Sequence, residues 1–307
     1  MNRKNMIPLL VLVVLIIIFL LTKLNDKTEK IISFFDVDSS KVAVIEIETN
    51  EDTLKLSKID GKWMIDYPIH DAATQRKLDD LFKKVLPVTT SSIPVSESES
   101  SFATYNVTDS LGTIIKLYDA GSRLLKSAII GTSSGYNNSS ARYSGDNKIY
   151  RLKENITHSL KPDINSWRNK DVLVMDKENI KNIFVSYENV NYTLSATDTL
   201  WNYMDTKETV SIKKENSTLK NIVNGMARVR VTSFIDDDIE TYLPKFEEPV
   251  FELTVELFDE EKHFLKFIES DEKNKIILQV DDQTDHLYVM FESWIKKFQK
   301  PVEDFSK

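Results

Sequence analysis

The sequence predicts an α+β fold in which an N-terminal transmembrane helix precedes two tandem related units, each a largely antiparallel sheet with one packed amphipathic helix. Three observations predict it: an uncharged apolar segment near the N-terminus, short β-like segments around one helical segment, and the recurrence of that pattern in the second half of the chain. The expected organisation is an anchor over residues 1–24, a linker over 25–41, a first α+β repeat over 42–175 and a second over 176–307.

The first expected element is the apolar segment. Residues 6–21 are all apolar, and no charge interrupts residues 5–22. At about 1.5 Å per residue, the uncharged stretch gives about 27 Å of helix, close to the hydrocarbon thickness of a bilayer. A cleaved signal peptide would need a small-residue cleavage site, and none follows the apolar residues. A buried core helix is the other alternative, and an anchor that contacts the lipid bilayer through residues 5–22 is the favoured reading.

The orientation of this segment is less directly encoded, because basic residues flank it on both sides. The segment is similar to a signal-anchor, which leads a large C-terminal body outward. We therefore expect a single-pass protein of the inner (cytoplasmic) membrane with its N-terminus inside and an extracytoplasmic body.

Composition narrows the classes of function. The chain has a formal net charge of −8 and no cysteine. All 48 acidic residues follow the apolar segment, whereas Arg3, Lys4 and Lys23 of the 40 basic residues precede the body. A body this acidic repels nucleic acid, which is therefore not an expected partner. The lack of cysteine excludes disulfides, thiolate metal sites and cysteine nucleophiles.

The body shows the same order of segments twice. Three short β-like segments open the first half at residues 42–48, 53–58 and 61–66, and three open the second at 180–186, 192–195 and 200–205. The third segment of each set carries a tryptophan, Trp63 and Trp201, which are 138 residues apart. Because both occupy the same place in the pattern, a shared core role is the simplest interpretation.

One amphipathic helix is expected after each tryptophan segment. Its apolar residues recur at i, i+3, i+4 and i+7, the spacing that places side chains on one helical face. Asp71 is a candidate N-cap for the first helix and Ser211 for the second. The two apolar stripes are Leu78, Leu81, Phe82 and Val85, and Leu219, Ile222, Val223 and Met226.

Further β-like segments complete each half, at 88–95, 113–118 and 124–130 in the first and at 229–235, 251–258 and 263–268 in the second. Offsets between corresponding landmarks stay between 137 and 141 residues. This constancy predicts an internal duplication. Connections between the segments are short, which favours antiparallel pairing over parallel crossovers.

Several of these features together resemble a known family. They are Gly61-Lys62-Trp63, Pro68 before a helix that opens near Asp71, Tyr105, Ile130-Gly131 and Ile149-Tyr150. The arrangement resembles the bacterial family known as domain of unknown function 4340, over roughly residues 5 to 300. The resemblance implies no established activity. It implies membrane or envelope protein partners, including transporter components, because genes of the family often neighbour transporter-like genes.

The sequence departs from the family pattern in places. Asn106 stands where the family usually has glycine after the tyrosine, and the second half has Thr199-Leu200-Trp201 in place of Gly-Lys-Trp. The second half also has no Ile-Gly turn. The second repeat has therefore drifted from the pattern of the first.

No catalytic constellation can be read in the chain, so an enzyme is not expected. Gly131, Ser133 and Gly135 fit the G-x-S-x-G nucleophile elbow, but that elbow needs a helix directly after the serine, whereas the following residues are typical of a hairpin loop. The four histidines are scattered singly, so no metal site is expected. No glycine-rich phosphate loop occurs, and no cofactor is expected.

The best candidate contact surface is the loop from Gly131 to Ser140, with Tyr136, Asn137 and Asn138 as the residues of a possible interaction site. The favoured function is a non-enzymatic accessory or scaffold subunit of a cell-envelope or transporter-associated assembly. The alternative is an extracytoplasmic hydrolase or polymer-binding module centred on that loop, in which Ser133 would need a histidine within hydrogen-bond reach.

Overall fold

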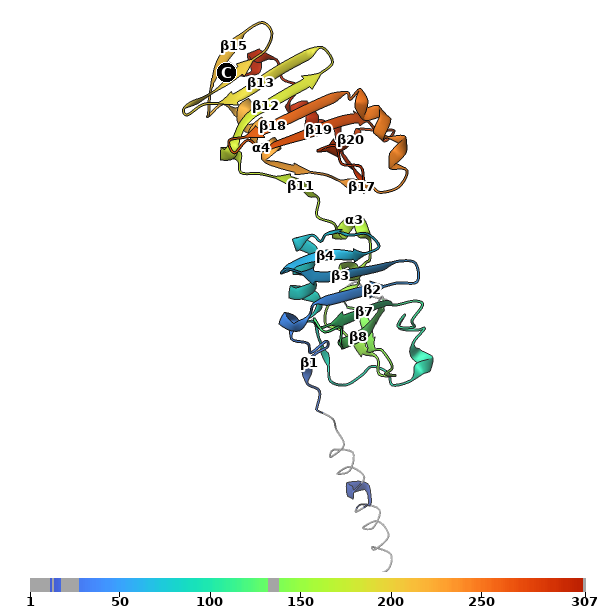
Figure 1. Cartoon of the computed structure of the whole chain (residues 1–307). Coiled ribbons are helices and arrows are strands. Elements are labelled where there is room, and N and C mark those ends of the chain that lie inside the picture. The colour runs from blue at the N-terminus through green and yellow to red at the C-terminus, as the bar shows by residue number, and fades with distance from the viewer. Residues whose placement is uncertain (1–11, 13, 18–27, 132–137, 306–307) are drawn as a thin grey trace, which may run out of the picture. The chain divides into compact units, whose positions relative to one another are not determined.

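The computed structural model of the chain describes residues 12, 14–17, 28–131 and 138–305. The chain divides into two compact units, Met1–Arg168 and Asn169–Lys307, named here unit 1 and unit 2 (Figure 1). Each unit is built around one large antiparallel sheet and has its own hydrophobic core.

The strands of unit 1 are short and mostly alternate between buried and exposed side chains, because successive side chains of a strand point to opposite faces. They are β1 (Ile31–Ser33), β2 (Val44–Glu48), β3 (Thr53–Ile59), β4 (Lys62–Tyr67), β5 (Asp71–Ala72), β6 (Thr89–Ser91), β7 (Thr113–Tyr118), β8 (Leu124–Gly131), β9 (Ser140–Tyr143) and β10 (Tyr150–Arg151). Eight of them form one sheet in the order β10-β9-β8-β7-β2-β3-β4-β5, while β1 pairs with β6.

The helical segments of unit 1 lie mainly on one face of this sheet. They are the 3-10 turns η1 (Ser39–Lys41), η3 (Glu99–Ser101) and η4 (Thr157–Leu160), and the helices α2 (Gln75–Asp80), which continues as the π-helical turn η2 (Leu81–Val85), and α3 (Ile164–Trp167). Leu78, Leu81 and Val85 are buried in the core and Phe82 is partly buried against it, so the predicted apolar stripe is confirmed.

The predicted N-cap of the first helix is wrong. Thr74 precedes α2 and makes no side-chain capping bond. Asp71 lies in β5, and its carboxylate accepts a 2.7 Å hydrogen bond from Nε of the buried Arg168. A buried guanidinium without a carboxylate partner would be strongly destabilising. Asp71 therefore pairs with Arg168 and does not cap the helix, although the local sequence suggested a cap.

Unit 2 contains a nine-stranded sheet. Its strands, together with β11 and β16, which pair separately, are β11 (Asp171–Val174), β12 (Ile180–Tyr187), β13 (Val190–Ala196), β14 (Leu200–Met204), β15 (Thr209–Lys213), β16 (Arg228–Arg230), β17 (Ser233–Ile235), β18 (Phe251–Leu257), β19 (Lys262–Glu269), β20 (Lys275–Val280) and β21 (Leu287–Phe291). The order in the sheet is β15-β14-β13-β12-β18-β19-β20-β21-β17 (Figure 1). Read from β5, the order of unit 1 corresponds to this order strand for strand as far as β21.

The helix α4 (Ser217–Ala227) covers one face of the unit 2 sheet. Leu219, Ile222 and Met226 are buried in the core, as the predicted stripe requires. The predicted cap Ser211 is wrong, because Ser211 lies in β15 and the side chain of Asn216 accepts the capping bond from the backbone N–H of Leu219 at 3.0 Å. The remaining turns are η5 (Lys177–Asn179), η6 (Ile239–Thr241), η7 (Leu243–Glu247), η8 (Glu292–Lys297) and η9 (Val302–Phe305).

The opposite face of each sheet, called here the outer face, is covered only in part. In unit 1 the chain segment 99–112 lies over one end of it, where Val107 packs with Ile129 and Ile149. In unit 2 the turns η6 and η7 cover the corresponding end, with Ile239 and Phe246 buried against β19, β20 and β21. The strands at the other end of each sheet keep their outer face open.

Two parts of the sequence-based expectation are wrong. Within the described residues, no helix is long and apolar enough to cross a membrane, which contradicts the predicted transmembrane helix and single-pass inner-membrane location. A span needs about 20 consecutive helical residues. Of residues 5–22, the structure describes only Leu12 and residues 14–17, all helical, and the rest lie outside the described residues.

The first amphipathic helix also differs from the expectation. The sequence predicted a helix that opens near Asp71 and carries the apolar stripe from Leu78 to Val85. Antiparallel strands dominate both units, and α2 is only six residues long. The backbone instead changes to a π-helical turn at Leu81, which keeps Leu81 and Val85 in the core.

Candidate binding site

The open part of the outer face of the unit 2 sheet is a candidate site. It lies on β14, β13, β12, β18 and β19. In β12, the buried residues Ile183 and Val185 face the core with α4, and the alternating residues Phe184 and Ser186 face outward. The outward side chains line a shallow groove of about 400 Å³, which we call the open-face groove.

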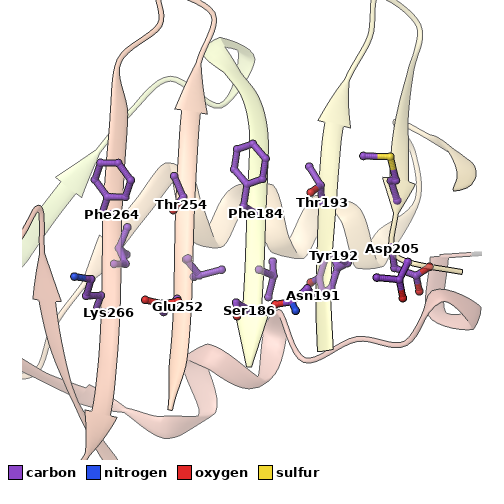
Figure 2. A pocket seen from close by; sticks show the side chains of 15 residues that line it. Phe184, Ser186, Asn191, Tyr192, Thr193, Asp205, Glu252, Thr254, Phe264 and Lys266 are labelled. Atoms are coloured by element: carbon purple, nitrogen blue, oxygen red, sulfur yellow. The ribbon is translucent and has the colours of Figure 1, made fainter. Parts of the chain in front are cut away.

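An apolar row runs across the open-face groove. Direct cross-strand pairing places Phe184 between Thr193 and Thr254, and extends the row to Met204 on one side and Phe264 on the other. Figure 2 shows Phe264, Thr254, Phe184 and Thr193 side by side on four adjacent strands. Phe184, Phe264 and Met204 are 39%, 43% and 51% exposed. Large apolar side chains aligned across strands on a solvent-facing surface are typical of a contact surface.

A polar row lies beside the apolar one. It consists of Asn191, Ser186, Glu252 and Lys266, again as direct cross-strand partners (Figure 2). Nζ of Lys266 contacts the carboxylate of Asp282 at 2.7 Å, whereas the side chain of Glu252 makes no hydrogen bond or ion pair with any residue in the described part of the chain. The row therefore presents an unpaired carboxylate to the groove.

A second carboxylate lies at the β14 end of the open-face groove. Backbone N–H groups of Glu208 and Lys207 donate to the side chain of Asp205 and hold the pKa of that carboxyl below its usual range. Burial raises the pKa of the neighbouring Tyr203 hydroxyl well above its usual value, and Asp205 adds to the effect. Asp205 is therefore ionised and Tyr203 neutral at physiological pH.

The corresponding surface of unit 1 differs in chemistry. Glu46 is paired directly with Lys55 and Lys116, the same arrangement as Phe184 with Thr193 and Thr254. Each of these residues precedes its unit 2 counterpart by 138 positions. Nζ of Lys116 contacts carboxylates of Glu48 at 2.5 Å and Glu46 at 3.9 Å.

The other side chains on this part of unit 1 are also paired. Lys55 contacts Asp66 at 3.1 Å. The Tyr118 hydroxyl donates to Glu46 at 3.0 Å, and burial together with this bond raises the pKa of Tyr118 to about 12. The open surface of unit 1 is therefore satisfied internally by its own charges, and the open-face groove of unit 2 is not.

The predicted interaction loop is only partly visible. Gly131 and Ser140 are direct partners in the β8–β9 pairing, so the segment between them connects two antiparallel strands. Tyr136, Asn137 and Ser133 lie outside the described residues. Asn138 is half-buried and lines a separate groove of about 340 Å³ with Pro94, Arg151 and other residues. The structure does not bring Asn138 to the open-face groove, whose lining comes entirely from unit 2.

The side chains of the open-face groove are of kinds that suit binding. Among them, no group of three histidine, aspartate or glutamate side chains is placed to hold a metal ion. His263 contacts Asp281 at 2.9 Å and does not itself line the open-face groove, although its neighbour Phe264 does. The groove itself offers apolar rings, hydroxyls and carboxylates, which suit the recognition of another molecule.

Sequence reasoning missed Phe184, Met204 and Phe264. A signal was present in the run Ile183-Phe184-Val185, because three successive apolar residues in a strand place one of them on the wrong face for a half-buried sheet.

Together, the fold and the groove define a two-unit, mainly antiparallel β protein whose second unit presents an open apolar contact surface. The chain belongs to the family described as Domain of unknown function (DUF4340), whose sequence profile matches residues 63–246, more than half of the chain. That range is narrower than the resemblance seen in the sequence, and it runs from Trp63 on β4 through Phe246 on η7. No curated protein and no solved structure matches the chain.

Two of the glycines that carried the resemblance have structural explanations. Asp60 and Gly61 have φ values of 48° and 81°, so they form a two-residue turn of the type that joins twisted antiparallel strands, and glycine adopts this conformation without strain. In unit 2 the corresponding connection, residues 197–199, is one residue longer. A Cβ on Gly131 would lie 2.3 Å from the backbone oxygen of Tyr105, so the covering segment of unit 1 requires glycine there.

Proposed function

We propose that this protein is a non-enzymatic accessory subunit that binds a partner protein through the open-face groove of unit 2. The observation that carries the proposal is the row of Met204, Phe184 and Phe264, which is aligned across strands and left uncovered. Exposed apolar rows of this kind are unfavourable in water unless a partner covers them.

The free energy that a partner would gain by burying the two exposed rings is large enough for a specific contact. A phenylalanine side chain has about 200 Å² of surface, so a ring about 40% exposed leaves about 80 Å² to bury. At about 25 cal/mol per Å², covering one ring contributes about 2 kcal/mol, or about 30-fold in affinity. Phe184 and Phe264 together therefore suffice to make the groove the centre of a moderate-affinity interface.

The charges around the groove define the partner further. Asp205 and the unpaired Glu252 line it, while the ammonium group of Lys266 is already paired with Asp282. The chain as a whole has a net charge of −8. The complementary partner surface is an apolar ridge flanked by lysine or arginine, because opposite charges speed association and exclude acidic competitors.

We further propose that the two units are copies of one domain whose outer faces have diverged. The matching strand orders support this, as does the constant spacing of 138 residues between Glu46 and Phe184 and between Trp63 and Trp201. On this view unit 1 keeps an open surface whose charges pair with one another, and unit 2 has replaced the charged residues of the central row with Phe184, Thr193 and Thr254.

Two earlier expectations stay predictions. One is that the partner belongs to a cell-envelope or transporter-associated assembly. The other is hydrolase activity at Ser133, which lies outside the described residues.

The proposal is tested by comparing the Phe184→Ala/Phe264→Ala double variant with a matched control. The control is Phe258→Ala/Phe291→Ala, which removes two similarly exposed rings of unit 2 that do not line the open-face groove. Partners cross-linked to the full chain are identified by mass spectrometry, and the dissociation constant of the purified partner is measured for all three proteins.

The expected result is at least a 30-fold loss of affinity for the groove variant and a change of less than threefold for the control, with unchanged melting temperatures. Equal affinities of the groove variant and the unmodified chain would overturn the proposal.

A further inference from the structure

A second concave site of unit 2, distinct from the open-face groove, lies between α4 and η8. It has a volume of about 720 Å³. Five cationic side chains line it, and no carboxylate does: Arg228, Arg230, Lys296, Lys297 and Lys300. Because the chain has a net charge of −8, this concentration of positive charge runs against its overall composition. We call it the basic pocket.

The cations of the basic pocket are only partly neutralised by their neighbours. Asp171 accepts hydrogen bonds from Arg228 at 2.6 and 2.9 Å and from Arg230 at 2.9 Å. These bonds hold the pKa of the Asp171 carboxyl below its usual range, so that carboxylate is ionised at neutral pH. The single carboxylate of Asp171 therefore pairs with the guanidinium groups of both Arg228 and Arg230. Each guanidinium keeps N–H donors that Asp171 does not use and that a ligand can accept from.

The lysines of the pocket are held more weakly. Lys296 contacts Glu292 at 3.0 Å, but both side chains are exposed, and Lys300 reaches Asp304 only at 4.0 Å. Exposed pairs of this kind contribute little energy and exchange readily for another anion. The side chain of Lys297 makes no ion pair or hydrogen bond with any residue that the structure describes. Five cations thus face three carboxylates, an excess of two positive charges.

The backbone of α4 also favours access to the pocket. Gly225 lies inside this helix and lines the pocket, although glycine in a helix interior is less stable than alanine by about 0.5–1 kcal/mol. Packing does not require glycine there, because an added Cβ would meet Lys297 and Phe298 only at ordinary contact distances of 3.6 Å. Gly225, Asn221 and Asn224 all line the pocket, and a glycine adds no side chain to it.

We propose that the basic pocket binds a small ligand that carries at least two phosphate groups. The pocket is lined by guanidinium donors from β16 and by ammonium donors from η8 and the segment that follows it, and the side chains of Thr218, Asn221 and Asn224 add neutral donors. The volume exceeds that of a single phosphate, and the excess of two positive charges matches a multivalent anion. Screening limits the field of the distant acidic residues to about 8 Å at physiological ionic strength, so the local cations dominate.

The experiment uses the full chain and inorganic pyrophosphate as the probe. Trp294 lines the pocket, so its fluorescence provides a local signal, and calorimetry gives the stoichiometry. Citrate, sulfate and vesicles that contain cardiolipin, a lipid with two phosphate groups, are tested in parallel, because they separate phosphate from carboxylate recognition and a soluble ligand from a lipid headgroup.

The informative variants differ in charge and position. Lys297→Gln/Lys300→Gln removes two pocket cations and is expected to weaken pyrophosphate binding at least tenfold. Lys262→Gln/Lys273→Gln removes the same charge elsewhere in unit 2 and is expected to change it less than twofold. Asp171→Asn releases both arginines and is expected to tighten binding severalfold, a gain that misfolding cannot produce.

The outcomes separate clearly. Saturable 1:1 binding of pyrophosphate that follows this variant pattern supports the proposal, and vesicle binding with the same pattern assigns the phosphate to a lipid. No saturable binding, equal losses in the two lysine variants, or citrate binding as tight as pyrophosphate binding would overturn it.

Discussion

The substitution Gly131→Ala tests why the Ile-Gly motif of this family exists in unit 1. The added Cβ would lie 2.3 Å from the Tyr105 oxygen, 2.7 Å from the Asn106 oxygen and 2.9 Å from the Asn106 carbonyl carbon. Ordinary contacts begin near 3.4 Å, and the neighbours are backbone atoms, so the covering segment must move rather than a side chain. Overpacking costs about 1–3 kcal/mol, and a backbone clash belongs at the upper end.

The assay is urea unfolding followed by hydrogen exchange and mass spectrometry. With a urea dependence of about 2 kcal/mol per molar, a cost of about 3 kcal/mol lowers the unfolding midpoint of unit 1 by about 1.5 M. Peptides from β7 and β8 report on unit 1, and peptides from β18 and β19 serve as the internal reference because unit 2 has its own core.

The control is Gly121→Ala, whose Cβ meets nothing nearer than Oδ1 of Asp119 at 3.4 Å. It should change stability by less than about 0.5 kcal/mol. If Gly131→Ala and Gly121→Ala shift the midpoint equally, the steric explanation of the motif is wrong.

Three further predictions concern stability. Trp201→Ala should lower the free energy of unfolding in urea by about 3–5 kcal/mol, because the ring is buried. Trp63→Ala should lower it clearly less, because that ring is only half-buried. The reverse order would contradict the burial assigned to the two rings. Gly225→Ala should raise the unfolding free energy of unit 2 by about 0.5–1 kcal/mol, and a loss would show that the 3.6 Å contacts are strained. The hydrogen bond from Arg228 lowers the pKa of Asp171 in the folded chain. The ionised carboxylate therefore stabilises the fold at pH values above about 3.9, the pKa of an aspartate in the unfolded chain. This stabilisation is lost as the pH falls through the lower pKa of the folded chain. The stability difference between the unmodified chain and Asp171→Asn should therefore be constant near neutral pH and shrink below about pH 4, and a difference independent of pH would contradict this.

Much of the local structure followed from the sequence. The stripes of the two helices depend on a spacing that any helix imposes, and Leu78, Leu81, Ile222 and Met226 are buried as expected. The antiparallel pairing followed from short connections. These features depend on residues close together in the chain.

The helix-capping residues and the binding site could not be predicted from the sequence. Asp71 looked like a cap because local sequence favours one, yet its partner is Arg168, 97 residues away. The apolar row was equally hidden, because Phe184 acquires its neighbours Thr193 and Thr254 only through the register of three strands. The basic pocket likewise joins arginines of β16 to lysines of η8 and of the segment after it.

The sequence by itself determined which side chains face a core, since the periods of strands and helices are properties of the local backbone. The tertiary structure alone decided which outward-facing side chains stay uncovered. In unit 1, the segment 99–112 and ion pairs such as Lys116 with Glu48 occupy the outer face, whereas in unit 2 the turns η6 and η7 cover only one end and leave Phe184 and Phe264 in water. Whether a covering segment reaches a given strand depends on the path of the chain between distant elements, and no local pattern encodes that path.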